Sequence, residues 1–99
     1  MSKKFQGIFP ALTTPFDGED LAVPRFRENI AKFNAFDLSG YVVLGSTGEC
    51  VLLSNDESER LIRAARETAA PDKLVIAGTG QESTKLTIAF TNRMAAAGA

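Results

Sequence analysis

Apolar residues along the chain fall into short unbroken runs, separated by longer stretches in which they recur at helical spacing. The runs cover residues 7–12, 41–44 and 74–77, and glycine, proline or polar residues bound each of them, as is typical of strands. A run without alternation indicates a strand buried on both faces, as in a parallel sheet. We therefore predict three parallel strands that lie side by side in chain order.

The stretches between these runs predict helices. In the first, Phe26, Ile30 and Phe33 recur at i, i+4 and i+7 and form one apolar stripe. The second begins after Ser54, which together with Glu57 matches the capping box. The third can be capped by Ser83 or Thr84 and is closed by Gly98. We expect the three helices over residues 24–36, 55–69 and 84–97.

Strands that alternate with helices predict an α/β fold, with parallel strands and the helices outside. Ninety-nine residues suffice for one small domain, and no linker marks a second one. Three parallel strands leave two open edges and one uncovered face. A fourth strand would start where the chain stops, so we expect residues 1–99 to be part of a larger fold.

Composition narrows the functional classes. Eleven basic and twelve acidic residues give a net charge of −1, so we expect neither nucleic-acid nor membrane binding. Histidine is absent and Cys50 is the single cysteine, which excludes a histidine triad, an internal disulfide and a multi-cysteine zinc site. Without a signal-like or membrane-spanning segment, we expect a cytoplasmic protein with no metal and no cofactor.

The sequence GSTGE, residues 45–49, follows the second apolar run directly. Ligands of parallel α/β sheets sit at the carboxyl ends of the strands, which is where this loop would lie. Gly45 and Gly48 allow close approach of the backbone to an anion, and Ser46 and Thr47 add two hydroxyl groups. The alternative is a tight turn whose hydroxyls serve only its own backbone.

Three segments carry a resemblance to a known family: GIFPALTTPF, GYVVLGSTGECVLLSNDE and KLVIAGTGQEST. In this order and at these separations they resemble the dihydrodipicolinate synthase and N-acetylneuraminate lyase family. The resemblance implies that residues 1–99 are the amino-terminal (βα)3 segment of a TIM barrel. It also implies a homotetrameric class I aldolase or lyase acting on pyruvate or a related 2-oxo acid, with the 4-hydroxy-2-oxoglutarate aldolase type as the closest subgroup.

The same resemblance implies roles for individual residues. Thr47 and the loop amides, with Gly45 and Gly48, would hold the substrate carboxylate. Ser46 would relay a proton to and from a tyrosine, and Ala11 would line the pocket.

In this family the imine-forming lysine and the catalytic tyrosine lie further along the barrel, beyond Ala99. We expect the lysines of this chain to be solvated surface residues; they are Lys3, Lys4, Lys32, Lys73 and Lys85. We expect Tyr41 to pack at the amino end of its strand, Cys50 to be a small buried apolar residue, and Glu49 to anchor the loop.

Two functional hypotheses follow. The first is a segment of a class I aldolase or lyase, inactive alone because it lacks the lysine and the tyrosine. The second is a non-enzymatic module that binds anions or associates with another chain through its open edges.

Overall fold

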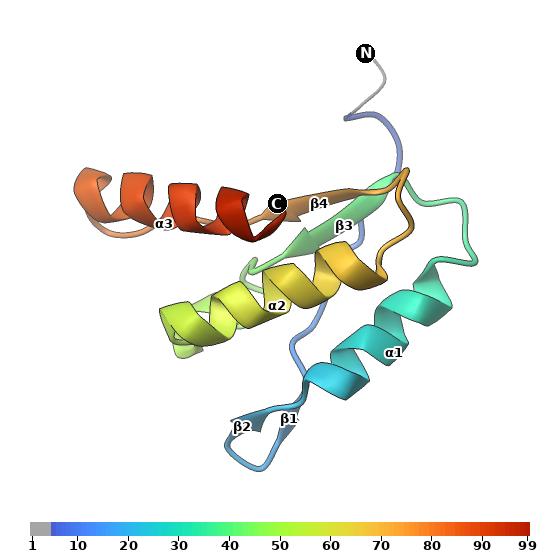
Figure 1. Cartoon of the computed structure of the whole chain (residues 1–99), viewed down its shortest axis with the longest axis horizontal. Coiled ribbons are helices and arrows are strands. Elements are labelled where there is room, and N and C mark those ends of the chain that lie inside the picture. The colour runs from blue at the N-terminus through green and yellow to red at the C-terminus, as the bar shows by residue number, and fades with distance from the viewer. Residues whose placement is uncertain (1–4) are drawn as a thin grey trace.

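The computed structural model describes residues 5–99 (Figure 1), so Lys3 and Lys4 lie outside the described residues. In chain order the elements are β1 (Phe16–Asp17), β2 (Asp20–Leu21), α1 (Val23–Phe33), β3 (Gly40–Val43), the short 3-10 helix η1 (Cys50–Leu52), α2 (Asn55–Thr68), β4 (Leu74–Ala77) and α3 (Thr84–Ala97). Strands β3 and β4 pair in parallel, with Tyr41 opposite Val75. The fold is therefore α/β with a parallel sheet, as predicted.

The prediction of a regular strand over residues 7–12 is wrong. In this segment Ala11 alone pairs with β3, opposite Val42. The Leu12 N–H donates to the Val42 carbonyl, and the Val42 N–H donates to the Pro10 carbonyl, both at 2.9 Å. Pro10 has no N–H to continue the ladder toward the amino end. This bridge is parallel and places the segment beside β3, but within residues 5–99 the parallel sheet itself consists of β3 and β4.

A two-residue hairpin, β1 with β2, lies between this segment and α1 and was not predicted from the pattern. Phe16 pairs with Leu21 and Asp17 with Asp20 in antiparallel register. Gly18 lies in the turn between them and has a φ of +64°, which favours glycine. Strands of two residues are too short to show an alternating pattern, so the sequence marks only the turn.

The capping residues predicted the ends of the helices more accurately than the apolar stripe of the first helix did. Ser54 and Glu57 form the capping box of α2, with the Ser54 side chain accepting from the Glu57 N–H at 3.1 Å. Helix α3 has the predicted bounds, follows Ser83 and ends before Gly98. Helix α1, by contrast, stops at Phe33 rather than at residue 36, and that side chain is exposed.

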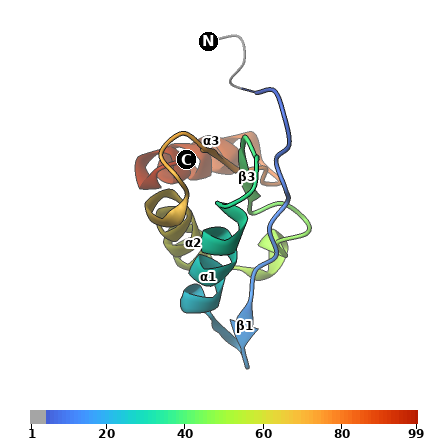
Figure 2. The same ribbon diagram turned by 90° about the vertical axis from the view of Figure 1, so that its right-hand side faces the viewer.

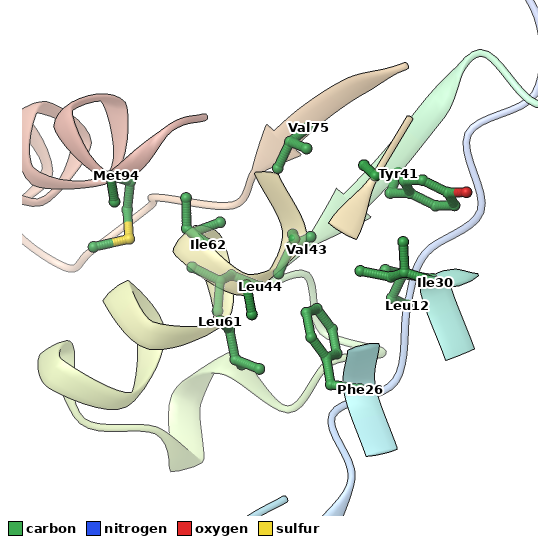
Figure 3. Packing of buried hydrophobic residues seen from close by; sticks show 14 of the residues in the cluster. Leu12, Phe26, Ile30, Tyr41, Val43, Leu44, Leu61, Ile62, Val75 and Met94 are labelled. Atoms are coloured by element: carbon green, nitrogen blue, oxygen red, sulfur yellow. The ribbon is translucent and has the colours of Figure 1, made fainter. Parts of the chain in front are cut away.

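The core lies between the sheet and the helices. Its fully buried side chains come from both layers (Figure 3); the largest are Tyr41, Phe26, Ile30, Leu44, Leu61, Ile62, Met94 and Val43. Helices α1 and α2 lie to one side of β3 (Figure 2), where Tyr41 and Val43 are buried. Val42 and Ile76, which point to the opposite face, are only half-buried. Within residues 5–99 the sheet is therefore covered on one face, in agreement with the prediction that three strands alone leave one face uncovered.

Among the helices of residues 5–99, none combines the length and the apolar character that a membrane crossing requires.

Candidate functional site

The loop of residues 45–49 is a closed turn at the carboxyl end of β3. Leu44 and Glu49, on either side of it, have φ values of +65° and +57°, in the left-handed region that non-glycine residues rarely adopt. Inside the turn, the Gly48 N–H donates to the Gly45 carbonyl and the Glu49 N–H donates to the Ser46 carbonyl, both at 3.0 Å. The turn is held by its own backbone rather than by its side chains.

Two glycines allow this turn to pack against its neighbours. A Cβ atom on Gly48, which is buried, would lie 3.1 Å from the Leu12 carbonyl oxygen and 3.3 Å from Thr14 Oγ1. A Cβ on Gly78, just after β4, would lie 2.2 Å from the Leu44 carbonyl oxygen, closer than a real Cβ atom comes. The loop is therefore packed tightly between the segment that follows Ala11 and the end of β4.

The side chains of Ser46 and Thr47 are exposed at the outside of the turn. Within residues 5–99 neither hydroxyl forms a hydrogen bond, and the N–H groups of the same two residues form none either. The alternative that these hydroxyls serve only the backbone of the turn does not describe this structure. Two hydroxyl and two amide donors are instead available to an anion at the carboxyl end of β3.

The structure does not bring all of the predicted site residues together. A cavity of about 360 Å³ lies beside the loop; Gly45 and Ser46 line it with Leu44, Cys50, Val51, Leu53, Asn55, Ser58, Gly78, Gly80, Gln81, Glu82 and Phe90. Ala11 lines a different cavity, of about 230 Å³, next to Phe26 and Phe33 of α1. Thr47 lines neither of these two cavities.

Thr14 is a residue of this region that the sequence reasoning missed. Its side chain is buried, and its Oγ1 donates to the Gly48 carbonyl at 2.6 Å. The segment Thr14-Pro15-Phe16 supported the family resemblance, but no role for the hydroxyl was derived from it. The contact joins residues 34 positions apart, so a local pattern carries no signal for it.

Glu49 and Cys50 contribute less through their side chains than expected. The Glu49 carboxylate is exposed and forms no hydrogen bond or ion pair within residues 5–99, so its part in the loop is its left-handed backbone. Cys50 is half-buried and packs against the core, which is close to the predicted small apolar role.

Tyr41 packs in the core, as predicted. It lies on β3, is completely buried, and its hydroxyl donates to Asn34 Oδ1 at 2.7 Å. Burial, and to a smaller extent the negative charge of Asp72, raises the pKa of the Tyr41 phenol above its usual value. Its position at the amino end of the sheet separates it from the loop.

The prediction that every lysine is a surface residue is wrong for Lys73. Lys32 and Lys85 are exposed, but Lys73 is buried at the amino end of β4. Its Nζ donates to the carbonyls of Phe36 at 3.0 Å and Leu38 at 2.8 Å. These carbonyls come from the segment between α1 and β3, and a polar environment assembled from distant residues does not show in the sequence around Lys73.

Comparison with known proteins agrees with the fold. The model of the dihydrodipicolinate synthetase family matches residues 4–99, almost the whole chain. The chain belongs to this family. Its matches include proteins named as dihydrodipicolinate synthases and as N-acetylneuraminate lyases.

Individual relatives show how much of a family member this segment represents. It is 45% identical over 95 residues to the 4-hydroxy-tetrahydrodipicolinate synthase of Xanthomonas axonopodis pv. citri, covering 94% of this chain and 31% of that protein. The dihydrodipicolinate synthase structure from Aquifex aeolicus matches with a TM-score of 0.87 at 33% identity, over 96% of this chain and 32% of the other. The N-acetylneuraminate lyase structure from Mycoplasma synoviae matches with a TM-score of 0.83 at 27% identity, over 98% and 34%. The chain thus spans about a third of the length of the family members that it matches.

Proposed function

We propose that this chain is the amino-terminal (βα)3 segment of a class I aldolase or lyase, and that its loop of residues 45–49 binds the carboxylate of pyruvate or a related 2-oxo acid. The observation that carries the proposal is the set of donors at the carboxyl end of β3. Ser46 and Thr47 present two hydroxyls and two N–H groups that no other group in residues 5–99 uses. Hydrogen bonds from such donors to a carboxylate are charge-assisted and therefore strong.

The two hydroxyl residues take different parts in this proposal. Thr47, through its hydroxyl and its N–H, would hold the carboxylate together with the Ser46 N–H. Gly48 allows the turn to pack against Leu12 and Thr14, and the Gly45 carbonyl accepts from the Gly48 N–H. The Ser46 hydroxyl would relay a proton to and from a tyrosine supplied by the rest of the barrel. Ala11 lines a separate cavity and does not line the cavity beside the loop. In this proposal it only lies on the segment that pairs with β3 next to the loop.

The chemistry itself needs an amine that this segment does not supply at the loop. A lysine amine would condense with the ketone of the 2-oxo acid, releasing water, and the protonated imine would accept the electron pair when a C3 proton leaves or a C3–C4 bond breaks. Lys32 and Lys85 are exposed, and Lys73 is buried at the opposite end of the sheet from the loop. The segment alone is therefore expected to be inactive.

The uncovered face of the sheet is consistent with this reading. Val42, Leu74 and Ile76 lie half-buried on the face that no helix covers in residues 5–99. In a closed barrel this face points inward and is packed by side chains from the other strands. The rest of a barrel is thus the proposed cover for these side chains, in preference to the non-enzymatic module, which family membership does not favour.

Several expectations stay predictions. They are the homotetrameric assembly, the cytoplasmic location, the absence of metal, cofactor and nucleic-acid partner, and the 4-hydroxy-2-oxoglutarate aldolase subgroup.

The proposal can be tested with a chimera in which residues 5–99 replace the matching segment of the Xanthomonas synthase. The chimera is incubated with pyruvate and borohydride, digested, and analysed by mass spectrometry. We expect one reduced pyruvate adduct, on a lysine outside residues 5–99. A control chimera with Lys85→Gln should trap the same adduct. An adduct on Lys32, Lys73 or Lys85, or catalysis without any trapped adduct, would contradict the proposed chemistry.

A further inference from the structure

Within residues 5–99, Thr14 is the one side chain that donates a buried hydrogen bond to a carbonyl of the loop. Its Oγ1 donates to the Gly48 carbonyl at 2.6 Å, and the side chain is 5% exposed. This hydrogen bond matters for the buried hydroxyl, because an unpaired polar group at this point would be destabilising.

The hydrogen bond from Thr14 sets the orientation of one loop peptide group, and that orientation affects the next peptide group that it bonds. A trans peptide group points its carbonyl and its N–H to opposite sides, and none of the described peptide bonds is cis. The carbonyl of Gly48 and the N–H of Glu49 share one such group, so holding the carbonyl with Thr14 directs that N–H away from Thr14. It donates to the Ser46 carbonyl at 3.0 Å.

The Ser46 carbonyl in turn shares its peptide group with the Thr47 N–H. Because this carbonyl is held inward by Glu49, the Thr47 N–H points out of the turn, and within residues 5–99 nothing accepts from it. An equivalent bond, from the Gly48 N–H to the Gly45 carbonyl, turns the Ser46 N–H outward. The two outward N–H groups are those assigned above to the carboxylate.

We propose that Thr14 is a positioning residue for the anion-binding loop: its hydroxyl fixes the peptide group of Gly48 and Glu49 and thereby aims the Thr47 N–H at the substrate carboxylate. Thr14 does not touch the substrate in this arrangement. The inference rests on the proposed function of the loop, and it deepens that function by naming the group that pre-organises the donors.

The test measures KM for pyruvate and kcat in the chimeric synthase carrying Thr14→Val, Thr14→Ser or Thr13→Val. Valine has the shape of threonine without the donor, serine keeps the donor, and Thr13 is an exposed neighbour outside the loop contact. We expect Thr14→Val to raise KM about three- to tenfold with kcat nearly unchanged, as for loss of one hydrogen bond that acts equally on bound substrate and transition state. Thr14→Ser and Thr13→Val should match the parent enzyme.

A second measurement separates this inference from the proposed function. Thr47→Val removes a hydroxyl that is assigned to the carboxylate itself. If Thr47→Val raises KM and Thr14→Val does not, the positioning role is wrong and the loop function stands. If neither variant changes KM, the loop does not bind the carboxylate and both proposals fall.

A variant that misfolds would still leave the inference testable. Thr14→Cys keeps a weaker donor, so its KM should lie between those of Thr14→Ser and Thr14→Val, or above that of Thr14→Ser if the valine variant is insoluble. A cysteine variant with the KM of the serine variant would overturn the role of the hydroxyl as a donor.

Discussion

The two ends of the parallel sheet differ in whether their polar groups are hydrogen-bonded within residues 5–99. At the amino end, the Asn34 side chain donates to the Thr68 carbonyl at 2.8 Å and accepts from the Tyr41 hydroxyl at 2.7 Å and the Ala70 N–H at 3.2 Å. At the carboxyl end, the donors of Ser46 and Thr47 point outward and have no acceptor within residues 5–99. The Asn34 side chain and its partners at the amino end are thus hydrogen-bonded to one another, whereas the donors of Ser46 and Thr47 at the carboxyl end are unpaired within residues 5–99.

Cationic side chains extend the closed network at the amino end. Lys73 Nζ donates to two carbonyls of the segment that precedes β3, and Arg66 donates to the carbonyls of Ala70 at 3.1 Å and Lys73 at 3.0 Å. These bonds fasten the ends of α1 and α2 to the starts of β3 and β4.

The difference separates stability from function. Polar groups that are hydrogen-bonded inside the segment contribute to its stability, and their hydrogen-bonding capacity is already occupied. Donors without a partner at the carboxyl end of a strand are instead suited to bind a ligand. Substitutions at the amino end should therefore change stability and leave kinetics alone, and substitutions of the loop should do the reverse.

The largest effect is expected for Lys73→Met at the amino end. The substitution leaves the carbonyls of Phe36 and Leu38 without their donor, and we expect the free energy of unfolding of the chimeric synthase to fall by about 3–4 kcal/mol. Urea denaturation measures this, and KM and kcat should stay at parent values. Lys85→Met, at an exposed position, is the matched control; an equally small loss for both would contradict the buried role of Lys73.

Ser46→Ala comes next and acts at the carboxyl end. If the hydroxyl relays a proton, kcat should fall about 100-fold, equivalent to about 2.7 kcal/mol in the barrier, with KM little changed. Steady-state kinetics measure the split, and the urea midpoint should not move. A change confined to KM would assign Ser46 to substrate binding rather than to proton transfer.

Thr47→Val should weaken binding of the 2-oxo acid by about 1–3 kcal/mol, the range for a hydrogen bond to a charged group. Pyruvate KM in the chimera reports the loss, and kcat and unfolding should be near those of the parent. Unchanged kinetics in both loop variants would show that residues 45–49 are only a turn and would remove the functional half of the comparison.

The smallest effect is expected for Tyr41→Phe, which removes the hydroxyl bonded to Asn34 and should cost about 1 kcal/mol of unfolding free energy near pH 7. Because burial raises the pKa of Tyr41 in the folded state, the native protein keeps this proton at pH values where the unfolded chain loses it. The stability tied to the neutral phenol is therefore intact below about pH 10 and is lost as the pH rises through the raised folded value.

Unfolding measured as a function of pH checks this sign. The difference in stability between the parent and Tyr41→Phe should narrow above about pH 10, where the unfolded chain ionises. A difference that stays constant over that range would show that the folded state does not hold the phenol neutral.

Features that depend on neighbouring residues were determined by the sequence itself. The capping box of Ser54 and Glu57, the start of α3 after Ser83 and its end before Gly98 follow from groups within a few positions of each other. The unbroken apolar runs before GSTGE and GTG likewise gave β3 and β4 nearly at their observed bounds. The loop was identified as a candidate site because it follows such a run directly.

Only the tertiary structure decided how distant groups use one another. Lys73 is buried because carbonyls 35 and 37 positions away accept from its ammonium, and Thr14 meets the Gly48 carbonyl across 34 positions. Pro10 interrupts the first strand because it lacks the N–H that would donate to the neighbouring strand β3. A local pattern records the propensity of each segment, but a polar group's partner is set by the packing of segments far apart in the chain, and that partner decides whether the group stabilises the fold or is left for a ligand.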